Sequence, residues 1–558
     1  MVFKTGLIIY RHQRFNEVYQ TSIKYGLSLR KLNYSKSKDP HKKQISAASI
    51  KGIRQIRELT YRSSTRLQDN RFVSLISKIG TLQALSIDLS SRESLVFREV
   101  KAIIRKIFSR IKRVVDLRIC FPGQDEGKRI FLEPISWLRS LQHLKLNLNY
   151  KNDYALDTLA AFLQVIYRRK IWPFLKWQEM ELNLGPEVAQ EVVSNNLMSL
   201  SKLLNHIVQG RNSEMLDIKL HLPLARNPSV PAFAKLAEDL KNLSHLKKLA
   251  LESDCDLNGF CLIKAIQDNK FLRHLALNLS QQQADKVFFI LPECLTSLSV
   301  KITSFSKPQC MNQFATKLSS LSHLTNLTLS LRRVTDLDDE FLTLLSQSFS
   351  SLPHLRQLEI NIKNQGVVRS QITSKGFKNL CQGVGQLTSL RELLLEFKNF
   401  GRIFSNDSFI VLSDSIEKLN RLSFLKLSLN FNAIGSEGVM RFAKVLPKLG
   451  SLETFGLWLK RCDLVNIKTL TTFAHNLGNL KAVSSLALDL MSQKVDCMLF
   501  SAFLASIHKL KSLDYLKLKI HRPEKEEVAE AYMQNMMEKF QGRMKVIYKL
   551  LQSFDDVV

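Results

Sequence analysis

LSFLKLSLNFNAIGSEGVMRFAKVLPKLGSL, residues 422–452, decides the fold of this chain. Its first half places leucine at Leu422, Leu425, Leu427 and Leu429. The alternation of apolar and polar residues predicts a short strand, because successive side chains of a strand point to opposite faces. Between 436 and 452 the apolar spacing changes to threes and fours, which predicts a helix. One strand and one helix cannot bury their own apolar sides, but stacked copies of the pair can.

The same plan recurs along the chain. The strand pattern returns as HLKLNL at 143–148, HLALNL at 274–279, NLTLSL at 326–331 and YLKLKI at 515–520, and helical spacing returns at 339–355, 406–422 and 497–513. With weaker copies included, repeats start at positions 82, 114, 141, 177, 215, 246, 272, 295, 324, 355, 390, 422, 452, 483 and 513, about 31 residues apart. The predicted fold class is α/β: a curved solenoid of about 15 strand–helix repeats, with a parallel concave sheet and helices on the convex side.

The strand pattern followed by NFNAIGSEGV, residues 430–439, resembles the long, helix-bearing repeats of the ribonuclease-inhibitor class of leucine-rich-repeat proteins. The resemblance covers roughly 82–520 and implies a horseshoe-shaped solenoid that binds proteins, without identifying a partner. That class usually carries Asn or Cys after the strand, where it satisfies backbone groups of the turn. Eight positions after the repeat start, Asn149 and Asn430 fit this pattern. Other repeats depart from it there, with Pro122, Gly185, Pro223, Arg332, Lys363 and Met491.

Three segments follow from the limits of the repeat. Residues 1–80 are predicted to be a basic N-terminal arm or cap, residues 81–520 the solenoid, and residues 521–558 a helical C-terminal cap that covers the last core layer. The alternative for 521–558 is a docking helix for a partner. Residues 1–38 hold eight Lys or Arg and the single acid Glu17, which resembles a mitochondrial presequence. A basic arm that is retained has the same composition.

The positive charge is concentrated in the first third. The 558 residues have a net charge of +31 and a pI near 9.8, which favours polyanions such as nucleic acid, anionic membrane or acidic proteins. Residues 1–176 carry thirty-five Lys or Arg and thirteen Asp or Glu, a net of +22. The concave positions, four and six residues after each repeat start, carry seven positive and six negative residues. A polyanion is therefore expected to bind within residues 1–176.

Two basic features in this region suggest polyanion contacts. The arm interleaves aromatic with basic residues, which suits single-stranded nucleic acid, and residues 93–115 form a predicted basic amphipathic helix. The alternative is that these basic side chains lie on a solvated helix face. The candidate polyanion-binding residues are Arg11, Arg14, Lys24, Arg30, Lys31, Arg98, Lys101, Arg105, Lys106, Arg110, Lys112 and Arg113.

Two apolar residues are candidates for protein binding. Leu394 and Trp458 occupy concave positions of their repeats, where the strand alternation places the side chain outside the core. A large aromatic residue at such a position can anchor an interface. The alternative is that Trp458 only fills space between neighbouring side chains.

No pattern indicates chemistry. The eight cysteines are scattered singly, the histidines follow the repeat, and Asp336, Asp338, Asp339 and Glu340 precede a predicted helix, where acids favour the helix dipole. No phosphate-binding glycine loop or nucleophile elbow occurs. We therefore predict no catalytic, cofactor or metal site, and no enzyme.

The same features give an expected location. Unpaired cysteines favour a reducing intracellular compartment, the cytoplasm first and the mitochondrion as the alternative, and no stretch approaches the length of a transmembrane helix. Two functions fit: a non-enzymatic protein-interaction scaffold, or a structural subunit of a ribonucleoprotein, such as a mitochondrial ribosome, that contacts RNA through its basic first third.

Overall fold

A computed structural model of the chain forms two units, Met1–Leu272 (unit 1) and Arg273–Val558 (unit 2), each described by itself. The structure describes residues 31–36, 58–63, 82–88, 107–108, 114–120, 143–150, 176–184, 216–222, 238, 241, 246–253, 267, 269–279, 291–302, 308–332, 337–364, 371–463, 465–490, 497–521 and 545–551.

Unit 1 contains a parallel sheet in which each described strand pairs with the next. The strands are β1 (Lys31–Lys36), β2 (Glu58–Ser63), β3 (Ala84–Asp88), β4 (Asp116–Cys120), β5 (His143–Tyr150), β6 (Lys176–Leu184), β7 (Leu216–Leu222) and β8 (Leu246–Ser253). The register shifts between β5 and β6 and between β7 and β8. These shifts fall in the part of the sequence where the repeat is weakest.

Unit 2 contains a second run of parallel strands, paired in chain order. They are β9 (His274–Leu279), β10 (Ser297–Ile302), β11 (Asn326–Arg332), β12 (Gln357–Lys363), β13 (Glu392–Lys398), β15 (Phe424–Ser428), β17 (Thr454–Trp458), β18 (Ser485–Leu490), β19 (Tyr515–His521) and β20 (Lys545–Leu551). The register of these ten strands does not shift, so equivalent residues form straight rows across the sheet. A separate short pair joins β14 (Gly401–Ser405) to β16 (Asn432–Ala433).

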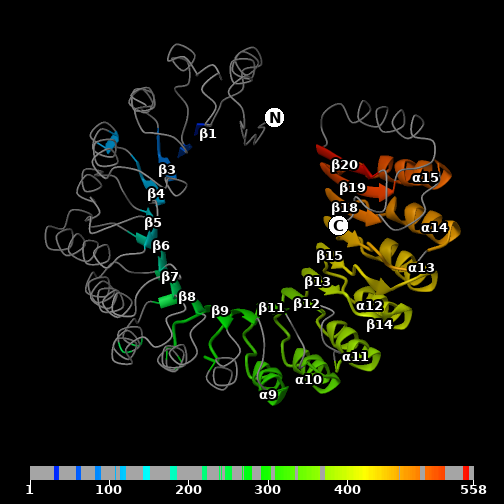
Figure 1. Cartoon of the computed structure of the whole chain (residues 1–558), viewed down its shortest axis with the longest axis horizontal. Coiled ribbons are helices and arrows are strands. Elements are labelled where there is room, and N and C mark those ends of the chain that lie inside the picture. Colours follow the sequence, from blue (N-terminus) through cyan, green and yellow to red (C-terminus); the bar gives the residue numbers. More distant parts are fainter. Residues whose placement is uncertain are drawn as a thin grey trace, which may run out of the picture. The chain divides into compact units, whose positions relative to one another are not determined.

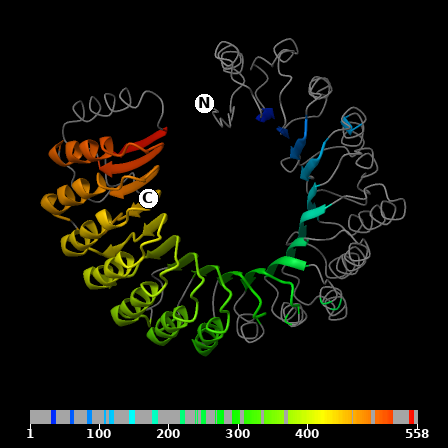
Figure 2. The same cartoon turned by 180° about the vertical axis from the view of Figure 1, so that it is seen from behind.

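Helices alternate with the strands of unit 2 and lie along one face of its sheet (Figures 1 and 2). They are α9 (Pro308–Leu318), α10 (Asp339–Phe349), α11 (Ser374–Val384), α12 (Asn406–Glu417), α13 (Ser436–Val445), the 3-10 turn η5 (Leu446–Lys448), α14 (Ile467–Leu477) and α15 (Cys497–His508). Several begin where the sequence predicts them, but they end earlier. After α12, for example, Leu419 and Leu422 donate backbone hydrogen bonds to residues three positions back, at 3.0 and 3.1 Å, and the chain turns into the next strand.

The core of unit 2 lies between the sheet and these helices. Two residues of each strand from β9 to β19, three and five positions after the predicted repeat start, point into it; in β15 these are Leu425 and Leu427, both 0% exposed. The equivalent residues of β12, β13, β17, β18 and β19 are at most 1% exposed. The predicted alternation of buried and outward-facing strand residues is confirmed.

The sheets extend beyond the limits that the repeat predicts. β1 and β2 lie within residues 1–80, and β20 lies within 521–558, where the sequence predicts a helical cap. β2 pairs with β3, and β20 pairs with β19, both in parallel. The leucine pattern is weak in KLNYSK (β1), so its pairing was not visible from spacing alone.

Asn432 closes the turn after β15. Its Nδ2 donates to the carbonyl oxygens of Phe397 (2.7 Å) and Leu429 (2.9 Å), and its Oδ1 accepts from the backbone N–H of Phe400 (3.0 Å). One repeat later Cys462 Sγ contacts the same Leu429 carbonyl at 3.2 Å. The turn residue therefore lies ten positions after the repeat start, and Asn430, the residue predicted for this role, accepts a single bond, from Lys460 N at 2.8 Å.

Polar side chains join neighbouring helices at their first turns. Asp339 Oδ1, at the start of α10, accepts from the N–H groups of Thr373 (2.7 Å) and Gly376 (3.1 Å) at the start of α11. Asn406, at the start of α12, does the same for Gly435 (2.8 Å) and Gly438 (3.1 Å) beside α13. These bonds satisfy N–H groups that a helix leaves without an internal partner.

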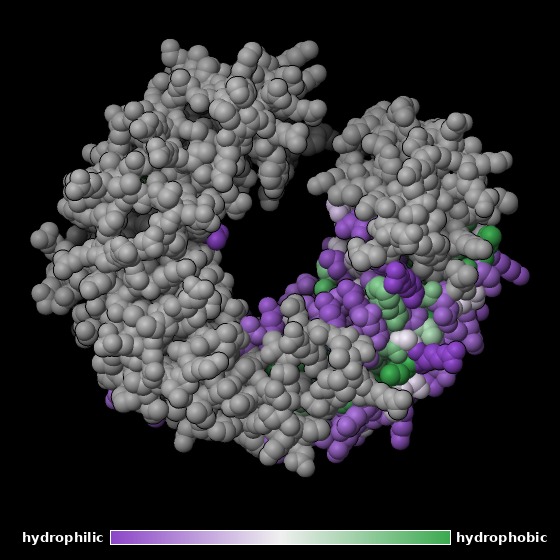
Figure 3. Space-filling view, viewed as in Figure 1, coloured by the Kyte–Doolittle hydropathy of each residue, from purple (hydrophilic) through white to green (hydrophobic). Residues whose placement is uncertain are grey.

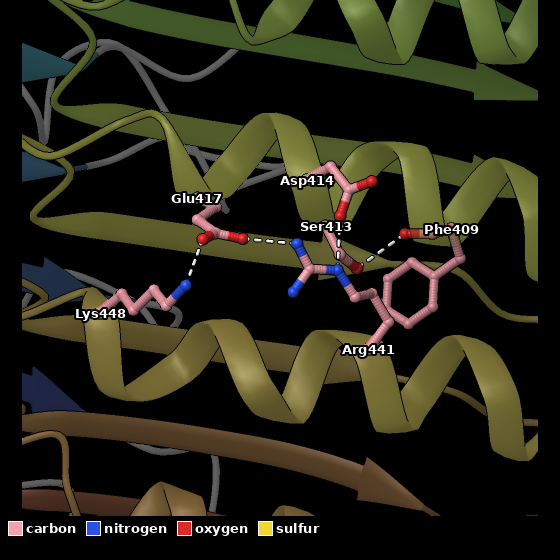
Figure 4. Close-up of polar contacts among 6 residues, drawn as sticks. All are labelled: Phe409, Ser413, Asp414, Glu417, Arg441 and Lys448. Atoms are coloured by element: carbon pink, nitrogen blue, oxygen red, sulfur yellow. Dashed lines mark hydrogen bonds and ion pairs between the residues drawn. The ribbon is translucent and has the colours of Figure 1, made fainter.

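Charged side chains join α12 to α13 farther along (Figure 4). Arg441 Nε lies 2.5 Å from Asp414 Oδ1, its Nη2 lies 2.5 Å from Glu417 Oε2, and Lys448 also pairs with Glu417. Hydrogen bonds from Lys448 and Arg441 lower the pKa of Glu417. These ion pairs are partly exposed, so they fix the spacing of the helices more than they stabilise the fold.

The described residues contain neither a membrane-spanning helix nor a group of metal-binding side chains. No helix among them is long and apolar enough to cross a membrane. Within the same part of the chain, no three His, Cys, Asp or Glu side chains lie close enough together to hold a metal ion.

Candidate binding face of unit 2

The sheet of unit 2 has one face without a described helix, called here the open face. Its rows are formed by the first, third and fifth residues of each strand, as Phe424, Lys426 and Ser428 of β15 illustrate. Nearly all of these side chains are half-buried. In the space-filling view, hydrophilic residues dominate the described surface of unit 2, and the hydrophobic areas between them are small (Figure 3).

An apolar patch lies in the middle of this face. Leu394 of β13 pairs in register with Lys426 of β15, and Lys426 pairs with Gly456 of β17. A Cβ at Gly456 would lie 2.5 Å from Cη2 of Trp458, so the indole ring rests directly on the glycine backbone. The Lys426 ammonium lies 4.7 Å from the centroid of the Phe424 ring, a cation–π contact. Both predicted protein-binding residues, Leu394 and Trp458, are thus half-buried on the open face.

A group of acids lies on β12 and β13, to one side of Trp458, and two of them, Glu392 and Glu396, flank Leu394 along β13. Glu396 accepts a hydrogen bond from Asn361 Nδ2 at 2.6 Å, and it pairs with Lys363 at 3.2 Å and with Lys398. Burial alone raises the pKa of Glu396, but hydrogen bonds and charge attraction from Lys398 and Lys363 outweigh burial, so the pKa lies below its usual value. Glu396 is therefore ionised, and both of its carboxylate oxygens have partners.

A basic end lies on the other side of the patch, on β19. Lys517 and Lys519 are both half-buried. Lys519 Nζ lies 3.6 Å from Asp489 Oδ2 of β18, and Asp489 pairs in register with Trp458 of β17. Asp489 is 5% exposed, because its neighbours on the face cover it.

The predicted polyanion-binding residues lie outside the part of the chain whose side chains are described. Lys31 is in β1, where the structure describes only the strand itself. Of the predicted basic helix 93–115, the structure describes Ile107 and Phe108 as helical; both are buried, at 1% and 0% exposed. Val114 and Val115 precede β4, and the remaining residues of the segment are not described.

Three residues of the face were not predicted from the sequence. Asn361 lies at an outward position, but it is polar and uncharged and so gave no signal of binding. Phe424 lies two positions after its repeat start, outside the positions predicted to face outward. Glu392 lies in the same row as Phe424. The alternation of strand side chains could have predicted Phe424 and Glu392, since the first residue of each strand points the same way as the third.

The two buried cysteines, Cys381 and Cys462, offer little reactivity. Burial raises the pKa of the Cys462 thiol to about 12 and raises that of Cys381 further. A thiol must lose its proton to act as a nucleophile, so these side chains are inert at neutral pH. What the open face can supply is shape, charge and an aromatic surface for binding.

Comparisons with known proteins do not assign this chain to a family. No model of a known protein family matches the sequence, and no curated protein is significantly similar to it.

Proposed function

We propose that this chain is a non-enzymatic protein-binding scaffold, built as a horseshoe-shaped leucine-rich-repeat solenoid of about fifteen repeats. The architecture is supported by the unshifted parallel register of β9 to β20, by helices on one face only, and by Asn432 and Cys462 at equivalent turns. Asn or Cys at this point is what the resembled class of repeats uses.

The apolar patch on the open face carries the proposal. Phe424, Leu394 and Trp458 are partly exposed near the centre of the face, one in each of its three rows, and most other positions of these rows are polar or charged. An aromatic anchor surrounded by polar residues is the arrangement of an interface whose binding energy is concentrated at its centre. Trp458 is held against Gly456 before any partner arrives, so little side-chain freedom remains to be lost on binding.

Site-directed photocrosslinking tests this function. A photoreactive amino acid replaces Lys426, beside the patch, or Lys468, an exposed residue of α14 that serves as the matched control. We expect one discrete protein adduct from the Lys426 position, none from Lys468, and loss of the adduct when Trp458→Ala is added. Equal labelling from both positions, with no effect of Trp458→Ala, would refute binding at the open face.

RNA binding is the second candidate function, favoured by the net charge of +22 within residues 1–176. Phosphate contacts release counterions, so affinity should fall steeply between about 50 and 200 mM salt. Replacing Arg98, Lys101, Arg105 and Lys112 with Gln should flatten that dependence, whereas replacing Lys426, Lys517 and Lys519 should not. A wild-type chain that binds no RNA at low salt excludes this candidate.

A further inference from the structure

The charges of the open face are segregated along the sheet. From β9 to β19 the open face carries four acids, Glu359, Glu392, Glu396 and Asp489, and six described lysines, Lys301, Lys363, Lys398, Lys426, Lys517 and Lys519. Three of the acids lie on β12 and β13, whereas two of the lysines lie on β19. The described charges of the face sum to +2, six lysines against four acids, but Lys363 and Lys398 pair with Glu396. The two carboxylates without a described partner therefore lie on β12 and β13, and Lys517, which has no acidic partner among the described residues, lies on β19, in a chain whose net charge is +31.

The acidic end has binding capacity that the described residues do not use. Glu359 and Glu392 lie on adjacent strands and are half-buried, and their carboxylates make no hydrogen bond or ion pair with any described residue. Beside them Asn361, 9% exposed, has a buried Oδ1 that receives no hydrogen bond. Its Nδ2 is bonded to Glu396, so the free oxygen lies within the acidic group. Two unneutralised carboxylates and an unfilled acceptor call for a positively charged donor.

The basic end calls for the opposite charge. Lys517 has no acidic partner among the described residues, and Lys519 reaches Asp489 only at 3.6 Å. Lysine is thus in excess at this end.

The spacing between the two ends sets the size of what could bind. β19 is the fifth strand after β12 in the order of pairing, which at about 4.8 Å per strand gives a span of about 24 Å. An extended peptide covers this span with about 7 residues, and a helix covers it with about 16. Trp458 of β17 lies between the ends, whereas Leu394 of β13 lies within the acidic end.

We propose that the open face receives one segment of a protein partner, basic where it lies over Glu359 and Glu392, apolar over Trp458, and acidic over Lys517 and Lys519. This rests on the proposed protein-binding function and names the chemistry of its partner. A nucleic acid does not fit, because its phosphates would meet the unneutralised acids. A uniformly basic segment would be repelled by the net charge of +31 and by the lysines of β19.

The test is selection from a displayed random peptide library, with peptides of about 16 residues, on the full chain. We expect the selected peptides to separate Lys or Arg from Asp or Glu by an apolar centre, and to lose binding with Trp458→Ala. Glu359→Lys with Glu392→Lys should weaken binding at least about tenfold, as for the loss of close charge pairs. Changing the basic residues of the peptide to Glu should restore binding to that variant. Glu340→Lys with Glu437→Lys, at exposed helix positions, is the matched control and should have little effect.

The outcomes separate this inference from the function on which it rests. Peptides that depend on Trp458 but are uniformly charged, or that tolerate the reversal at Glu359 and Glu392, would overturn the inference and leave the binding function standing. Selected peptides that ignore Trp458 altogether would overturn both. Thermal melting of each variant confirms that a loss of binding is not a loss of fold.

Discussion

Asn432→Ala should lower the free energy of unfolding more than any other single substitution of a polar residue in its turn. Asn432 is 3% exposed and makes three hydrogen bonds, of 2.7, 2.9 and 3.0 Å, to backbone groups of Phe397, Leu429 and Phe400. Alanine leaves two carbonyl oxygens and one N–H without this partner. A buried polar group without a partner costs about 1–3 kcal/mol.

The expected loss follows from that figure. The Leu429 carbonyl keeps its contact with Cys462 Sγ, so the other two groups, at about 1 kcal/mol each, give a loss of about 2 kcal/mol. The lower value per group applies because the removed side chain leaves room for water to reach the turn. Asn430→Ala is the control: Asn430 is half-buried and accepts one bond, from Lys460 N, so the loss should be about 1 kcal/mol or less. Asn432→Asp should also destabilise, because a carboxylate cannot donate to the two carbonyls.

Urea denaturation followed by circular dichroism measures all three variants, with a shift of midpoint at constant slope reporting the loss of stability. Our reasoning fails if Asn432→Ala costs no more than Asn430→Ala, or if Asn432→Asp is as stable as the wild type. Either result would mean that water or local rearrangement satisfies the turn without the amide.

Three further predictions test the fold. Leu427→Ala should cost about 2–5 kcal/mol because its side chain is fully buried, whereas Lys426→Ala on the open face should cost less than about 0.5 kcal/mol; equal shifts in denaturant melts would contradict the facing of the strand. Gly376→Ala places a Cβ 2.2 Å from Asp339 Oδ1 and should break the bond between helices, lowering the melting temperature even though alanine favours helices. Since the pKa of Glu396 is lowered by folding, its carboxylate stabilises the fold above the ordinary value of 4.5, and this contribution is lost as the pH falls through the lowered value; the stability gap between wild type and Glu396→Gln, measured from pH 7 to pH 3, should therefore shrink in acid, and a constant gap would contradict it.

The strands of unit 2 were predictable because burial and periodicity agree there. Leu425 and Leu427 alternate with polar residues, and the same spacing recurs often enough to set the register of its neighbours. The ends of the helices were not predictable to the same degree. Leu419 and Leu422 keep a helical spacing and are buried, yet they belong to a turn, since apolar periodicity does not distinguish a helix from the packed turn that follows it.

The turn and the binding face show a different limit. Asn430 and Asn432 both follow the strand, and only the three-dimensional path of the backbone decides which amide reaches Phe397 and Leu429. Trp458 and Leu394 could be placed on the outward side by alternation alone. That Gly456 lies under the indole ring depends on the rotamer of Trp458, which no sequence pattern specifies.

A count of charged residues at outward positions also does not show how the charges are distributed along the sheet. Seven positive and six negative residues in the outward positions predict a surface with almost no net charge. Unshifted register turns these positions into rows. Glu359 and Glu392 lie diagonally on adjacent strands, about 24 Å and about 19 Å from Lys517, respectively. At physiological salt the Debye length is about 8 Å, so the two ends act on a ligand independently and their charges do not cancel. A ligand must therefore satisfy each end locally, which is a condition on the order of its charges. Attraction to a polyanion through residues 1–176 depends instead on the sum of charges and should weaken with salt far more steeply.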